Sequence, residues 1–180
     1  MYFNMHIHVK LQFREKMSHN GNVDLTGTGY CATFNLRRTA RAVTRMFDMA
    51  LKESGMRSTQ FSILVGIMKS QPVSIGALAE VLIIDPTTLT RSLRLLQKEG
   101  LITISNRAEM RQRFLKITGK GERALARSLP AWRKVQQRFV TTVGAEQWKG
   151  LRNGLEELAH TITAFEEPSK DTQARKPTSF

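Results

Sequence analysis

The sequence predicts a mainly α-helical protein with one small β-hairpin, and three features carry this prediction. Apolar residues recur at helical spacing through most of residues 34–166. Between them, residues 101–105 and 113–117 alternate at the spacing of strands, and a short polar segment separates the two runs. The chain of 180 residues, with 41 % hydrophobic content, is long enough for one domain with a real core.

The two ends of the chain differ from this helical middle. Residues 1–32 have no sustained period and contain Asn20-Gly21, so we expect an irregular N-terminal extension. We hypothesise that Met17 is the natural start and that residues 1–16 lie upstream of it. Residues 167–180 are polar and contain proline, which predicts a flexible tail. The folded domain is therefore expected at residues 33–166.

The first strong helix is predicted at about 34–54. Its apolar stripe consists of Leu36, Ala40, Val43, Phe47 and Ala50. A row of arginines at a spacing of four consists of Arg37, Arg41 and Arg45. The arginine row is interpreted either as a solvated face or as a contact to DNA phosphates or to an acidic partner. Ser54-Gly55 ends this helix.

A second helix begins at Ser58 and is broken at Gln71-Pro72, where a short strand is expected. Ser74 then caps a short helix whose apolar positions share one face. Asp85-Pro86 has the pattern of an N-cap followed by the first helical residue, so another helix is predicted from there to about Glu99. Gly100 is placed to end it.

This fourth helix is two-sided. Its apolar side consists of Leu89, Leu93 and Leu96. Its opposite side consists of Thr87, Arg91, Arg94 and Lys98. One half therefore suits a protein core, and the other suits an anion.

A helix, a turn, a basic helix and a hairpin with a basic tip follow one another in the order of a winged helix-turn-helix, expected at about 57–118. In that arrangement the second helix of the motif enters the major groove, and the hairpin, or wing, reaches an adjacent minor groove. The residues predicted to bind DNA are Ser74, Thr87, Thr88, Thr90, Arg91, Arg94, Lys98, Arg107, Arg111 and Arg113.

Two further helices are predicted at about 119–166. Thr118 caps the first, and Pro130 is expected to kink or interrupt it. The second begins near Gly144 and carries a heptad-like apolar seam. Apolar helices at both ends of a winged module suggest burial against a second copy of the chain. The predicted dimerisation residues are Leu36, Val43, Phe47, Trp148, Leu151, Leu155, Leu158, Ile162 and Phe165.

The charge and the residue inventory narrow the function. A net charge of +13 favours a nucleic acid or an anionic surface as partner. Neither a catalytic constellation nor metal-ligand spacing is present in the sequence, so we expect no enzyme, cofactor or metal site. The longest apolar run, residues 61–68, is far shorter than the ~20 residues of a membrane span. With a single cysteine, the chain is expected in the cytoplasm.

Several of these segments resemble the multiple-antibiotic-resistance regulator (MarR) family over residues 34–165. The family's wing pattern, Asp-x-Arg followed five residues later by Leu-Thr, is matched by Glu109-Met110-Arg111 and Ile117-Thr118. Glu109 stands where the family has aspartate. The recognition helix Asp85–Leu93 and the run Leu96–Leu101 are also similar. The resemblance implies dimerisation through the terminal helices and control by a small, often aromatic or anionic, effector.

We therefore expect a sequence-specific double-stranded DNA-binding regulator, acting as a homodimeric repressor on an inverted-repeat operator. Some relatives sense hydroperoxides through a cysteine near the first helix, and Cys31 lies about two residues before that position. Both a redox sensor and an inert thiol remain open for Cys31. Two other classes of function stay open as well: a non-specific architectural or RNA-binding protein, and a winged-helix protein-interaction module.

Overall fold

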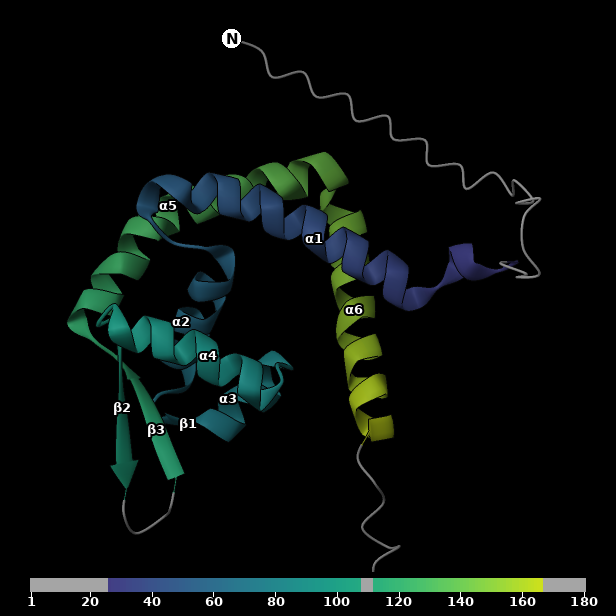
Figure 1. Ribbon diagram of the computed structural model, residues 1–180. Helices are drawn as coiled ribbons and strands as arrows, with labels where there is room; N and C mark the ends of the chain where they lie inside the picture. Colours follow the sequence, from purple (N-terminus) through teal and green to yellow (C-terminus); the bar gives the residue numbers. More distant parts are fainter. Residues whose placement is uncertain (1–25, 108–111, 167–180) are drawn as a thin grey trace, which may run out of the picture. The chain divides into compact units, whose positions relative to one another are not determined.

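The structure, a computed structural model, describes residues 26–107 and 112–166, and most of these residues are helical (Figure 1). The chain divides into two compact units, residues 1–46 and residues 47–180. The boundary falls inside helix α1 (Ala32–Leu51), so this helix contributes to both units. The hypothetical upstream segment 1–16 and the predicted tail 167–180 lie outside the described residues.

In the described part of the first unit, a 3₁₀ turn, η1 (Thr28–Tyr30), leads into α1. The Asn35 side chain donates hydrogen bonds of 3.0 Å to the carbonyl oxygens of Gly29 and Cys31. These bonds order the backbone just before the helix, and α1 begins at Ala32, two residues earlier than the apolar period indicated.

The second unit begins with the end of α1, where Leu51 is buried. A 3₁₀ turn, η2 (Lys52–Ser54), and Gly55 at φ 73° then lead to α2 (Ser58–Ser70). The Asp48 carboxylate accepts hydrogen bonds of 2.7 Å from both the backbone N–H and the hydroxyl of Ser58. These bonds hold the pKa of Asp48 below its usual value, and they join the end of α1 to the start of α2.

A three-stranded antiparallel sheet has the order β1-β3-β2. Strand β1 (Val73–Ser74) is the short strand expected after the proline, and β2 (Ile102–Arg107) and β3 (Gln112–Ile117) form the hairpin. The register places Ile102 opposite Ile117 and Arg107 opposite Gln112. Both strands extend beyond their predicted ends because the ladder of backbone hydrogen bonds continues through polar residues that break the apolar alternation.

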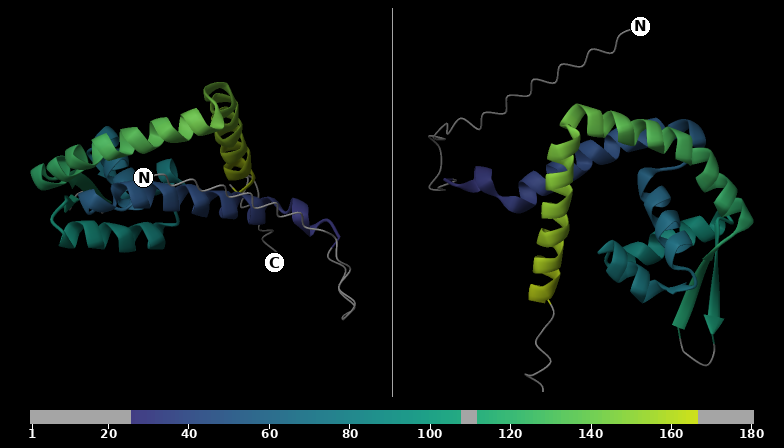
Figure 2. Two further views of the ribbon diagram at one scale, coloured as in Figure 1. Left: turned by 90° about the horizontal axis from the view of Figure 1, so that it is seen from above. Right: turned by 180° about the vertical axis from the view of Figure 1, so that it is seen from behind.

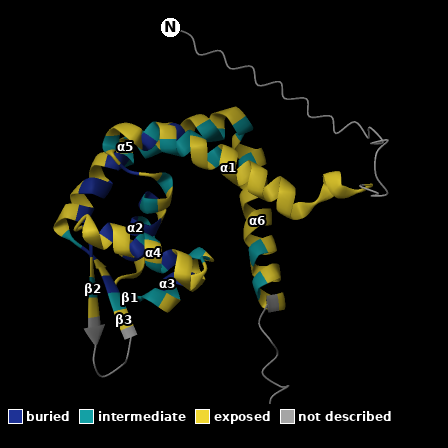
Figure 3. Cartoon of the chain, in the orientation of Figure 1, coloured by how far each residue is buried: buried dark blue, intermediate teal, exposed yellow. Residues whose placement is uncertain are grey.

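The core of the second unit lies between α2, the sheet, the start of α5 and the two helices α3 (Ile75–Leu82) and α4 (Pro86–Lys98). Figure 3 shows buried positions on these elements. The largest fully buried side chains are Leu51, Leu64, Ile67, Leu78, Leu89, Leu93, Leu96, Ile102, Leu115 and Ser128. At the edge of this core, Phe61 and Trp132 stack with their ring centroids 5.6 Å apart.

Helix α5 (Gly119–Val143) runs unbroken through Pro130, so of the two expected outcomes, a kink or an interruption, the interruption is wrong. The helix bends along its length, as Figures 1 and 2 show. Pro130 is exposed, whereas its neighbours anchor the helix on the core side. Two residues earlier, the buried Ser128 hydroxyl bonds to Ala124 O at 2.9 Å and to Ser54 Oγ at 3.0 Å. Gly144, at φ 97°, then separates α5 from α6 (Ala145–Glu166).

Candidate nucleic-acid interface

A tight turn joins α3 to α4. Ser74 Oγ accepts a 3.1 Å hydrogen bond from Ala77 N and so caps α3, as predicted. At the other end of α3, Ile83 takes the left-handed conformation at φ 50°, and Ile84 N donates to Ala79 O at 2.9 Å. The chain therefore leaves α3 abruptly and enters α4 after only three intervening residues, 83–85. This is the geometry of a helix-turn-helix.

The start of α4 is fixed by the residues that the sequence indicated. Asp85 Oδ1 accepts a 2.9 Å hydrogen bond from Thr88 N, and Pro86 occupies the first helical position. Leu89, Leu93 and Leu96 are all fully buried. Three leucines on one side and a cap at the N-terminus set both the position and the rotation of the helix on the core.

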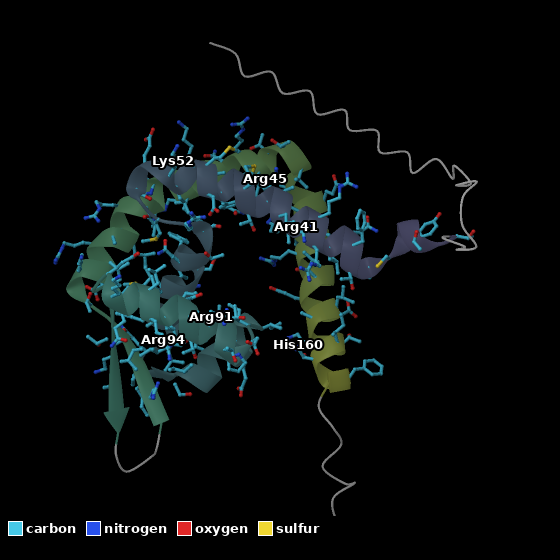
Figure 4. All side chains as sticks on the ribbon, in the orientation of Figure 1. Arg41, Arg45, Lys52, Arg91, Arg94 and His160 are labelled. Carbon is cyan, nitrogen blue, oxygen red and sulfur yellow. The ribbon has the colours of Figure 1, made fainter. Side chains whose placement is uncertain are left out.

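The rotation of α4 leaves one polar face in solvent. The exposed residues on this face are Thr87, Thr88, Arg91, Arg94 and Lys98. Figure 4 shows Arg91 and Arg94 on α4. Within the described residues, no hydrogen bond or ion pair engages either guanidinium. The structure thus brings five of the predicted DNA-binding residues together on one free surface.

Two other residues that were predicted to contact DNA are less accessible. Thr90 is half-buried, and its hydroxyl donates to Pro86 O at 2.7 Å. Ser74 is half-buried too, with its hydroxyl engaged as the cap of α3. In contrast, Leu95 is 49 % exposed one turn after Arg91, although the sequence pattern did not indicate it as a surface residue. Its side chain adds an apolar contact surface beside the basic face.

The last described pair of the hairpin is formed by Arg107 and Gln112. Residues 108–111, including Arg111, lie outside the described residues. Arg107 is the last residue of β2, and Arg113 is exposed on the neighbouring strand. Arg107 and Arg113 therefore belong to the end of the hairpin that is far from the helices, and their contact with DNA stays a prediction.

Hydrogen bonds tie the end of α4 to the start of α5. The Thr118 hydroxyl donates towards Gly100 O at 2.7 Å and Leu101 O at 3.1 Å, while its oxygen accepts from Gly121 N at 3.0 Å. Lys120 Nζ also donates to Glu99 O at 2.7 Å. Gly121 is required because a Cβ atom there would collide with Leu101 O. The sequence pattern indicated Thr118 as a cap and as part of the family's wing pattern, but it did not indicate this link to the end of α4.

Helix α6 carries a row of exposed apolar side chains. They are Leu151, Leu155, Leu158, Ile162 and Phe165, each between 39 % and 86 % exposed. Trp148, which was predicted to belong to the same seam, is half-buried against Phe139 in an edge-to-face contact with centroids 4.9 Å apart. Trp148 therefore packs at the α5–α6 corner within one chain, and the other five form what we call the α6 apolar row.

The predicted α1 residues are also partly or largely accessible. Leu36 is 42 % exposed, and Val43 and Phe47 are half-buried. Cys31 is exposed between η1 and α1. Its carbonyl oxygen accepts hydrogen bonds from the backbone and the side chain of Asn35, but its thiol has no hydrogen bond among the described residues. Redox activity at Cys31 stays a prediction.

Across residues 26–107 and 112–166, no three His, Cys, Asp or Glu side chains gather in a way that could hold a metal ion. In the same part of the chain, no helix combines the length and the apolarity needed to cross a bilayer.

Comparison with known proteins agrees with this geometry. The model of the MarR family matches residues 56–109, which include α2, β1, α3, α4 and all of β2. An uncharacterized HTH-type transcriptional regulator of Bacillus anthracis is 27 % identical over 136 residues, which cover 76 % of this chain and 91 % of the relative. Another, from Bacillus cereus, is 30 % identical over 112 residues, covering 62 % and 75 %.

Solved structures are similar as well. The Mycobacterium tuberculosis transcriptional regulator MosR in complex with DNA has a TM-score of 0.69 and 34 % identity, covering 76 % of this chain and 98 % of that one. A mutant of Escherichia coli MarR in complex with operator DNA has a TM-score of 0.67 and 18 % identity, covering 76 % and 99 %. The second likeness concerns the fold alone.

Proposed function

We propose that this chain, which belongs to the MarR family of winged helix-turn-helix transcriptional regulators, binds an inverted-repeat operator as a homodimer and represses transcription. One observation carries the proposal: α4 is anchored by three buried leucines and presents Thr87, Arg91 and Arg94 to solvent. A rigid helix with a free, basic face has the size and the charge to enter a major groove.

The proposed roles on α4 follow from side-chain chemistry. Arg91 and Arg94 offer planar donor pairs that fit guanine O6 and N7. Thr87 and Thr88, at the N-terminal end of the helix, offer a hydroxyl and a methyl group for base edges, and Lys98 offers a charge for phosphate. Thr90 and Ser74 are proposed as flanking contacts, because their hydroxyl oxygens can still accept or donate one further bond.

The wing is proposed to contact the neighbouring minor groove. Arg111 is the proposed tip residue, with Arg107 and Arg113 as phosphate contacts. Support comes from the register, which pairs Arg107, the last residue of β2, with Gln112.

The α6 apolar row supports the proposed homodimer. Five large apolar side chains along about 21 Å of helix form a continuous surface, and such surfaces on soluble proteins usually mark an interface. We propose that this row and the α1 residues Leu36, Val43 and Phe47 pack against a second copy. A two-fold axis then presents two α4 helices in opposite directions, which requires an operator with the same symmetry.

We further propose that residues 33–166 form the regulatory domain and that the protein acts in the cytoplasm. The proposed signal is a small anionic or aromatic effector, as the family resemblance implies, or oxidation of Cys31. Either signal acts by changing the relative populations of dimer arrangements with different spacings between the two α4 helices.

A competition experiment separates this function from binding by charge alone. A labelled duplex carrying the operator, mapped by footprinting on the promoter of the protein's own gene, is bound at physiological salt. We expect unlabelled operator to displace it at least about 10³-fold more effectively than an unrelated duplex of equal length. Equal displacement by both duplexes would support the architectural alternative and contradict the proposal.

A further inference from the structure

Helix α5 carries a second basic surface that the recognition of an operator does not use. Its members are Arg123, Arg127, Lys134 and Arg138, and we call them the α5 cation row. At 100° per residue all four fall within a 60° sector of the helix. They are exposed, and within the described residues no hydrogen bond or ion pair engages their charged groups. The row extends over about 22 Å.

Positively charged residues also far outnumber negatively charged ones in α5. Its 25 residues include six Lys or Arg and one acidic residue, Glu122. Helix α6, which follows directly, has two Lys or Arg and four acidic residues. Arg123 with Arg127, and Lys134 with Arg138, are like charges four residues apart, which repel each other on a helix surface. An ordinary solvated helix mixes both signs, so α5 is locally built to meet an anion.

The row lies away from the face of α4. Ala124 and Leu125 of α5 are buried in the same core as Leu89 and Leu93 of α4. Seen from above, α4 (teal) and α5 (green) lie at opposite edges of the second unit (Figure 2). No contact of three or more residue pairs joins the two helices, and α2 and the sheet pack against α5 instead. A straight duplex seated on α4 therefore does not extend along the α5 cation row.

A phosphate backbone fits the row better than a membrane surface does. Helices that lie on membranes insert a large apolar face, whereas the apolar side of α5 is in the core. All of α5 is described, and none of its large apolar side chains is among the exposed ones. Gln137, exposed between Lys134 and Arg138, and Thr141, exposed one turn beyond Arg138, add the neutral donors that are common at phosphates. Three of the four cations are arginines, which bind phosphate through two parallel bonds.

We propose that the α5 cation row binds the phosphate backbone of a second duplex segment, distinct from the one held by α4 and the wing. The contact is independent of base sequence. One protein bound at its operator can therefore hold flanking DNA that bends back, or a separate duplex. The inference rests on the proposed function for the first duplex and on the row alone for the second.

The test uses two variants that remove the same charges. R127Q/K134Q changes one arginine and one lysine of the row, and K149Q/R152Q changes one of each on α6. With the protein held on an immobilised duplex just long enough for the operator, capture of a labelled non-operator duplex is measured. We expect R127Q/K134Q to capture at least about tenfold less labelled duplex than the wild type, and K149Q/R152Q to capture as much as the wild type. All three proteins should bind the short operator equally.

Direct titration with the non-operator duplex keeps the two proposals separable. The slope of log Kobs against log salt should be lower by about 1.8 for R127Q/K134Q, since each neutralised phosphate contributes about 0.9. An unchanged slope and unchanged capture overturn the inference, as do weakened operator binding or dissociation of the dimer in R127Q/K134Q. So does row-dependent binding to phosphatidylglycerol vesicles without row-dependent binding to duplex. Failure of the wild type to prefer its operator contradicts the proposed function alone.

Discussion

The double variant L155E/L158E is expected to sediment as a monomer of 20.4 kDa, whereas the wild type at micromolar concentration is expected to sediment at twice that mass. Leu155 and Leu158 are 39 % and 41 % exposed in the single chain, in the middle of the α6 apolar row. Two carboxylates there place uncompensated charge in the proposed interface. Because a dimer binds its second half-site intramolecularly, the monomer should bind the operator about 10²–10⁴-fold more weakly.

The matched control adds two carboxylates to the opposite side of the same helix, at Asn153 and His160. Both residues are exposed, and N153E/H160E should remain a dimer with operator affinity close to that of the wild type. Circular dichroism and thermal melting of both variants show whether each chain stays folded. A folded wild-type monomer at micromolar concentration, or a dimeric L155E/L158E, would contradict the assignment of the interface.

Replacement of Arg91 by alanine should weaken operator binding and relax base choice at one position in each half-site. The loss of a bidentate base contact costs about 1–3 kcal/mol, and the symmetric site loses two such contacts. Binding to a set of operators with every base substitution, measured at fixed salt, gives both the loss of affinity and the base preference at each position. We expect the preference at one position to flatten while the other positions keep theirs.

Two further variants distinguish the loss of a base contact from the loss of a positive charge. Arg111→Ala in the wing should weaken binding more evenly across sequences, or in proportion to minor-groove width. Arg152→Ala on α6 removes the same charge from a helix without a proposed role in base recognition and should change affinity little. If Arg91→Ala and Arg111→Ala both bind a mapped operator like the wild type, the groove assignment is wrong.

The caps and boundaries of the helices could be predicted from the sequence because they depend on short-range chemistry. The caps at Ser74, Asp85 and Thr118 are where the sequence pattern put them. Gly100 at φ 72° and Gly144 at φ 97° mark the predicted helix boundaries. The buried leucines of α4 also follow from helical spacing alone, and together these features specified the helix-turn-helix and the orientation of its basic face.

Features that depend on tertiary contacts could not be predicted. The contact of Trp148 with Phe139 arises only once α6 folds back at the end of α5, whereas its spacing fits the apolar seam equally well. Pro130 does not break α5, since packing on both sides of it outweighs one missing hydrogen bond. The bond from Lys120 to Glu99 O joins residues that no periodic pattern relates. The wing tip with Arg111 lies outside the described residues, so its role rests on the sequence.

The spacing of half-sites tests the central claim, a two-fold dimer reading DNA with two α4 helices, most directly. Wild-type affinity is measured on operators whose half-sites are separated by increasing numbers of base pairs. Both helices must meet the major groove on one side of the duplex, so binding should be tightest with half-site centres about 10 bp apart and should collapse when five base pairs are inserted. Tight binding that is indifferent to the insertion, or equally tight binding to a single half-site, would contradict the dimeric reader.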